Sequence, residues 1–62
     1  VHHIGLRQQV HKLRAEYKDV VELAYFQGFK QDEIARLLQL PLGTVKTRIR
    51  SALIQLRTMI QE

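Results

Sequence analysis

Residues 31–56 read QDEIARLLQLPLGTVKTRIRSALIQL and predict the fold around which the chain is organised. Apolar residues recur at helical spacing over residues 31–38, and they do so again over residues 42–60. Between these segments Pro41 has no N–H and a fixed φ, so it suits the start of a helix and would break a helix interior. The stretch therefore predicts two helices joined by a tight corner at residues 39–43.

The apolar residues of both predicted helices fall on one face. In the first helix this face consists of Ile34, Leu37 and Leu38, and in the second of Val45, Ile49, Ala52, Leu53, Leu56 and Ile60. Ala35 supplies the small side chain that a steep crossing of two short helices requires. Gln39 occupies the corner position that is often glycine, where a left-handed conformation costs other residues energy. The spacing is typical of a DNA-binding helix-turn-helix, but a plain helical hairpin has similar periodicity, so both alternatives stay open.

The face of the second helix opposite its apolar stripe is basic and rich in hydroxyl groups. It carries Thr47, Arg50, Ser51, Ile54 and Thr58, and it is flanked by Lys46, Arg48 and Arg57. No acidic residue occurs between Thr44 and Gln61, whereas a solvated helix face normally mixes both signs of charge. Lys, Arg, Thr and Ser suit phosphates and guanine edges. The pattern therefore favours a nucleic-acid contact over the alternative of a merely soluble basic face.

The residues before this stretch predict two more helices. In residues 4–13 one helix face carries Leu6, Val10 and Leu13. A bend is expected at residues 14–15. In residues 16–27 one side gathers Tyr17, Val20, Val21, Leu23 and Ala24. Both segments therefore have an apolar face that can pack against the helix-turn-helix.

The second of these helices has a clear end signal. Gly28 is expected to cap it in the left-handed conformation, with Phe29 folding back onto the last turn. Lys30 then stands at the N-cap position of the next helix, where Ser or Asp would be better by about 1 kcal/mol. Asp32 and Glu33 in the following turn compensate in part through the helix dipole.

The chain has 62 residues, a formal net charge of +4 and no cysteine. This length allows one small domain with a thin core. Because the predicted segments all have helical periodicity, the expected fold class is all-α, with four helices over residues 1–62. Residues 31–60 are expected to form the helix-turn-helix, with a long second helix. The basic excess indicates a polyanion as partner, most simply nucleic acid. Without cysteine there is no zinc finger, disulfide or thiolate nucleophile, which fits a reducing cytoplasm. No apolar run reaches membrane-spanning length, no signal peptide opens the chain, and a start at Val1 suggests a piece of a longer protein.

Neither a metal site nor an active site is predicted. His2 and His3 lie in residues 1–3, which are expected to be a frayed terminus, and no third ligand follows at a fitting spacing. The carboxylates lie at helix starts and on polar faces, where helix-dipole and solubility roles suffice. An enzyme with a cofactor or a small-molecule substrate is therefore the weakest of the possible function classes.

Residues 17–57, YKDVVELAYFQGFKQDEIARLLQLPLGTVKTRIRSALIQLR, closely resemble the C-terminal DNA-binding domain (region 4) of sigma-70 family sigma factors, in the extracytoplasmic-function variant. The shared motif is an apolar helix with a Tyr-Phe-x-Gly end, a Glu-Ile-Ala helix, and Gly-Thr-Val-Lys-Thr-Arg opening the recognition helix. The resemblance implies a domain that binds the −35 promoter element and docks on the β-flap of the RNA polymerase core. It also implies a preceding domain that reads the −10 element, and an anti-sigma factor as inhibitor. The chain is then expected to be a fragment of a cytoplasmic bacterial sigma factor that directs transcription initiation.

The resemblance assigns roles to particular residues by their position in the motif. Base contacts in the major groove are implied for Lys46, Thr47, Arg50 and Ser51, and phosphate contacts for Thr44, Arg48 and Arg57. Two positions depart from the usual pattern. Lys30 replaces a common Ser, and Ser51 stands where Arg is frequent, which puts one base or phosphate contact in doubt.

A protein partner is expected to contact apolar residues that helical periodicity leaves on polar faces. These are Ile54, near the polar side of the recognition helix, and Phe26, which falls opposite Tyr17. Two other function classes stay open. One is the helix-turn-helix output domain of a response regulator, although no separate dimerisation helix is evident. The other is an interaction module that has lost DNA binding, which the intact basic residues of the recognition helix argue against.

Overall fold

The computed structural model describes residues 6–60, and the side chains of residues 8–59 within that range. Its elements are α1 (Leu6–His11), α2 (Ala15–Val21), the π-helical segment η2 (Glu22–Phe26), α3 (Gln31–Leu38) and α4 (Leu42–Ile60). The described residues hold helices and no strand, so the predicted all-α class is confirmed. The predictions for residues 1–3, and for the side chains of Leu6 and Ile60, lie outside what is described.

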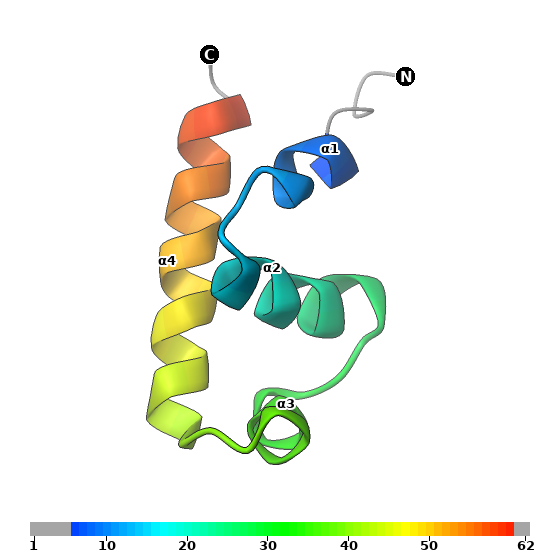
Figure 1. Cartoon of the computed structure of the whole chain (residues 1–62), viewed down its shortest axis with the longest axis vertical. Helices are drawn as coiled ribbons and strands as arrows, with labels where there is room; N and C mark the ends of the chain where they lie inside the picture. Colours follow the sequence, from blue (N-terminus) through cyan, green and yellow to red (C-terminus); the bar gives the residue numbers. More distant parts are fainter. Residues whose placement is uncertain (1–5, 61–62) are drawn as a thin grey trace.

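The longest helix, α4, is the element on which the others pack. It runs beside them along the molecule, with α3 at the end where α4 begins and α1 at the end where α4 stops (Figure 1). The helices α1, α2 and α3 each contact it. Its predicted apolar stripe is buried at Val45, Ile49, Ala52 and Leu56. One side of α4 therefore belongs to the core, and its other side is left on the surface.

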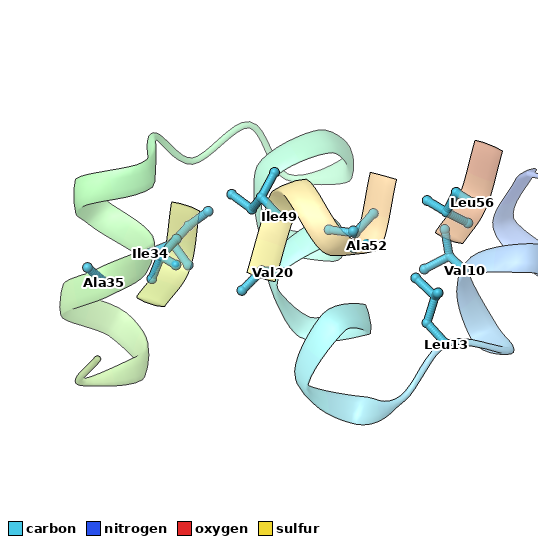
Figure 2. Close-up of a cluster of buried hydrophobic side chains, with 10 residues drawn as sticks. Val10, Leu13, Val20, Ile34, Ala35, Ile49, Ala52 and Leu56 are labelled. Atoms are coloured by element: carbon cyan, nitrogen blue, oxygen red, sulfur yellow. The ribbon is translucent and has the colours of Figure 1, made fainter. Parts of the chain in front are cut away.

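Buried apolar side chains from α1, from the connection after it, and from α2 and α3 meet this stripe. They are Val10, Leu13, Val20, Val21, Ile34 and Ala35. Figure 2 shows Leu56 of α4 beside Val10 and Leu13 of the N-terminal part, and Ile34 on the side of α3 that faces α4. Ile34, Val20 and Val45 are the largest fully buried side chains, and they join α3, α2 and α4. In so small a domain these few contacts carry much of the stability.

Backbone hydrogen bonds close the corner after α3. Gln39 has φ 57° and ψ 48°, the left-handed conformation expected for it. Its N–H donates to the carbonyl oxygen of Arg36 at 3.3 Å, and the N–H of Leu40 donates to that of Ala35 at 2.9 Å. This pair of bonds is a Schellman motif, which satisfies carbonyl groups that the end of α3 leaves without helical partners. The bonds offset part of the energy that the left-handed conformation costs a non-glycine residue.

The starts of α3 and α4 are capped without Ser, Thr or Asp at the N-cap. At α3 the backbone N–H of Lys30 donates to Oε1 of Glu33 at 2.7 Å, and this bond is one half of a capping box. The lysine side chain has no acceptor for the reciprocal bond. At α4 the carbonyl oxygen of Pro41 accepts the N–H groups of Thr44 at 3.0 Å and Val45 at 3.2 Å. Both helix starts lie at the positions predicted.

The end of the second helix is wider than an α-helix. The N–H of Gln27 donates to the carbonyl oxygen of Glu22 at 3.1 Å, a bond across five residues. The N–H of Phe29 donates to that of Leu23 at 2.9 Å. Gly28 between them has φ 79°, which confirms the predicted left-handed cap. Phe29 folds back as expected, and its half-buried side chain packs against the core.

This π-helical segment overturns one expectation from the sequence. Phe26 was expected to face away from Tyr17, but both side chains are half-buried and pack against the same core. A π turn holds more residues than an α turn, so it rotates the following side chains relative to an uninterrupted α-helix. Phe26 consequently points inward, and Tyr25 is the exposed aromatic residue, with 58% of its surface accessible. A partner contact through Phe26 stays a prediction, without an exposed side chain to support it.

Two leucines predicted for the apolar faces are exposed instead. Leu37 of α3 is 55% exposed, and Leu53 of α4 is 41% exposed. Both lie at the edge of their helix stripes, where the small neighbouring helices do not reach far enough to cover them. Both leucines therefore belong to the surface of the domain.

Candidate nucleic-acid interface

The predicted base-contacting residues lie on the surface side of α4. Lys46, Thr47 and Arg50 are exposed, and Ser51 is half-buried. Because side chains three and four residues apart share a helix face, Lys46, Thr47 and Arg50 form one continuous stripe. The structure thus brings together the three exposed residues, while Ser51 lies at the margin, toward the buried Ala52.

The predicted phosphate-contacting residues surround this stripe. Thr44 and Arg48 are half-buried, and Arg57 is exposed. Arg57 lies seven residues beyond Arg50, which corresponds to about 10 Å along the helix axis. A long helix with cations spread in this way can contact base edges near its start and phosphates farther along.

Charge on this face of α4 is uncompensated within the part of the chain that the structure describes. The ion pair found there is Asp32–Arg36 on α3, with 3.7 Å between a guanidinium nitrogen and a carboxylate oxygen. No carboxylate among the described residues pairs with Lys46, Arg48, Arg50 or Arg57. Free cations of this kind attract polyanions and release counterions when they bind DNA phosphates.

Farther along the same face, α4 bears a shallow hollow. Its lining residues are Arg50, Leu53, Ile54 and Arg57. Ile54 is 58% exposed, as predicted, and Leu53 joins it although the sequence placed Leu53 in the core. We call these four residues the α4 hollow. An apolar pair between two arginines differs from the polar stripe before it, so the surface of α4 has two chemically distinct halves.

Two residues of this surface escaped the prediction from sequence. Leu53 lies at the edge of the apolar stripe, directly before Ile54, which was expected to be exposed. This neighbouring position was the available sign in the sequence that Leu53 is exposed as well. Gly43 lies one turn before Lys46 and Thr47 on the same face, and it is exposed. A glycine inside a helix is itself a signal, because glycine weakens helices.

Other kinds of site find no support in the residues that the structure describes. They contain no group of three or more His, Cys, Asp or Glu side chains placed to hold a metal ion. No helix among them is long and apolar enough to cross a membrane. Buried polar or charged side chains, which enzymes often use, are also missing from the described core.

Comparison with known proteins agrees with the geometry. Residues 3–56 match the family described as sigma-70, region 4. Over 57 residues the chain is 35% identical to the ECF RNA polymerase sigma factor SigW of Bacillus subtilis (strain 168), an alignment that covers 92% of this chain and 30% of that protein. The chain therefore spans about a third of the length of this relative. In sigma factors, region 4 is the part that binds the −35 promoter element. The chain belongs to the sigma-70 region 4 family.

Proposed function

We propose that this chain reads the −35 promoter element as the region 4 domain of a larger sigma factor of the extracytoplasmic-function type. The observation that carries the proposal is the two-sided character of α4, the second helix of a helix-turn-helix. One side of α4 is core, and its other side presents cations that pair with no carboxylate among the described residues. In such motifs the start of the second helix enters the major groove. Family membership and the absence of a separate dimerisation helix among the described residues favour this function over a response-regulator output domain.

In this proposal Lys46 and Arg50 donate hydrogen bonds to guanine edges, and Thr47 and Ser51 contact neighbouring bases. Thr44, Arg48 and Arg57 hold phosphates and so set the register of the helix in the groove. A single small module covers only about 600–1,000 Å² of protein surface, so the isolated domain should bind weakly. The remainder of the sigma factor, which reads the −10 element, would supply the missing affinity through linkage.

Salt dependence is the first test of this interface. With up to four cations on phosphates and bases, the log–log plot of affinity against salt should have a slope of roughly −2 to −4, and affinity should fall about 15- to 250-fold between roughly 50 and 200 mM salt. Fluorescence anisotropy with a labelled −35 duplex measures this. Arg48→Ala, which removes a proposed phosphate contact, should make the slope shallower by about one unit. Salt-independent binding, or no binding at low salt, would count against the proposal.

The whole sigma factor would also contact the RNA polymerase core through its β-flap, and it would act in the bacterial cytoplasm, where promoter DNA and polymerase meet. Membership in the region 4 family supports the contact with polymerase. Leu37 and Tyr25 are exposed apolar side chains outside α4, so they are available to a protein partner while α4 holds DNA.

We also propose an anti-sigma factor as a regulatory partner, with the α4 hollow as part of its docking surface. The hollow pairs exposed aliphatic side chains with two arginines. An amphipathic helix with aliphatic residues flanked by carboxylates would match both features. Because Arg50 belongs to the hollow and to the base-reading stripe, the partner and the −35 element should exclude each other.

Ile54→Asp is expected to weaken the anti-sigma contact by more than tenfold, since a buried unpaired carboxylate in an apolar contact is costly. Its effect on binding to the −35 duplex should be smaller, because Ile54 lies beyond the base-reading stripe. Thr58→Asp is the matched control: it adds the same charge at the next exposed turn of α4, outside the hollow. Pull-down with the cognate inhibitor and anisotropy with DNA compare the two. A stable ternary complex of domain, inhibitor and DNA would exclude the competition, and full inhibitor affinity of Ile54→Asp would remove Ile54 from the contact.

A further inference from the structure

Gly43 is a residue whose identity the fold does not explain. It is the second residue of α4 and has helical backbone, with no left-handed φ. Glycine in a helix is less favourable than alanine, because it loses more backbone freedom on folding and adds no side-chain contact. A chain with so thin a core would be expected to avoid this loss unless the position has another use.

The interior of the molecule does not require the small side chain. A Cβ atom added at Gly43 would meet no heavy atom within 4 Å. Gly28 differs, since its φ of 79° accounts for glycine there. Close approach of another chain is the remaining common reason for glycine at a fixed position. That other chain must come from outside the domain, because the space around Gly43 is open.

The place of Gly43 on α4 indicates which surface approaches. Lys46, Thr47 and Arg50 follow it by three, four and seven residues, so Gly43 heads the same exposed stripe. Side chains in a helix lean toward its N-terminus, so those of Lys46 and Thr47 are directed toward the end of α4 at which Gly43 lies. Any molecule that contacts the stripe closely will meet the backbone at Gly43.

We propose that Gly43 is a positioning residue for DNA: its missing side chain lets the first turn of α4 lie directly against the sugar-phosphate backbone at the edge of the major groove. The inference rests on the proposed reading of the −35 element by α4. A Cβ atom at this point would hold the helix away from the groove and lengthen the contacts of Lys46, Thr47 and Arg50 together. Gly43 therefore trades stability of the free domain for affinity to DNA.

The test is Gly43→Ala in the 62-residue chain, and two quantities are measured: the melting temperature, which should rise, and the affinity for DNA, which should fall. The melting temperature should rise by roughly 2–8 °C, because alanine fits the helical backbone without a clash. Affinity for a −35 duplex should fall by about 5- to 100-fold, as for other cases of overpacking. A scrambled duplex at low salt should show a similar loss, since the contact is with the backbone. Gly43→Leu should bind more weakly still. The control is Gln8→Ala, an exposed and neutral change to alanine in α1, which should leave DNA affinity within about twofold.

The outcomes separate the inference from the function on which it rests. Equal DNA affinity of the wild type and Gly43→Ala would overturn the inference and leave the proposed function intact. A loss of affinity accompanied by a lower melting temperature would also overturn it, since glycine would then have a structural role. A wild-type chain that does not bind the −35 duplex even at low salt would remove the proposed function, and the inference with it.

Discussion

Ile34→Ala is expected to lower the free energy of unfolding by about 2–5 kcal/mol, the range for truncating a fully buried isoleucine. Ile34 has no accessible surface and joins α3 to the stripe of α4 that begins at Val45. Domains of this size have only a few kcal/mol of stability, so the variant should be largely unfolded at 37 °C. Thermal and urea denaturation followed by far-UV circular dichroism measures the change.

The control lies on the same helix. Leu37→Ala removes a side chain of the same size that is 55% exposed, so it should change the stability by no more than about 0.5–1 kcal/mol. The two variants together test which face of α3 is buried. Equal destabilisation by both changes, or an unchanged melting temperature for Ile34→Ala, would show that the orientation of α3 in the helix-turn-helix is wrong.

Arg50→Ala is expected to relax the sequence preference of the domain and to cost about 1–3 kcal/mol on the preferred −35 duplex. The reason is that an arginine in the exposed stripe near the start of α4 can hold a guanine edge with two hydrogen bonds, which no other base edge accepts in the same way. Selection of binding sites from a pool of random duplexes, with and without the substitution, measures the preference.

Arg57→Ala provides the comparison on the same face of α4. Both arginines are exposed and line the α4 hollow, but Arg57 lies two turns farther from the helix start. Because Arg57 is a proposed phosphate contact, Arg57→Ala should weaken binding to all sequences alike and make the salt slope shallower by about one unit. An unchanged preference in the Arg50→Ala selection would mean that Arg50 contacts phosphate too, and that the bases are read by other residues.

Much of the helix-turn-helix could be predicted because its signals are local. The bounds of α3 and α4 follow from helical periodicity, with Pro41 between them as a start signal. Gly28 could be expected in the left-handed conformation because it is a glycine just past the end of a helix, and Gln39 because it occupies the corner position that is often glycine. The division of α4 into a buried stripe and a basic exposed face also follows from spacing alone.

The π-helical segment η2 could not be predicted in this way. A π turn arises where tertiary contacts reward a different rotation of the chain more than a regular α-helix would, and Phe26 gains such contacts by packing against the core. An argument from periodicity assumes the same rotation angle for every residue of a helix. It therefore placed the side chain of Phe26 on the outside and did not predict that Tyr25 is exposed. The positions of Leu37 and Leu53 were missed for another reason: at the edge of a stripe, exposure depends on how far the neighbouring helices extend.

In the proposed complex the start of α4 lies in the major groove of the −35 element, and α1, which packs toward the other end of α4, is expected to lie away from the DNA (Figure 1). Since the chain has no cysteine, a single introduced cysteine can carry a DNA-cleaving iron chelate. Leu42→Cys places the chelate at the exposed first residue of α4. His11→Cys places it at the exposed last residue of α1, the helix that lies toward the far end of α4 (Figure 1). Strand cleavage is expected to centre within the −35 element for the Leu42→Cys conjugate and to be absent for the His11→Cys conjugate. Cleavage by the α1 conjugate alone, or cleavage by the α4 conjugate spread evenly along the duplex, would show that the start of α4 does not enter the major groove of the −35 element.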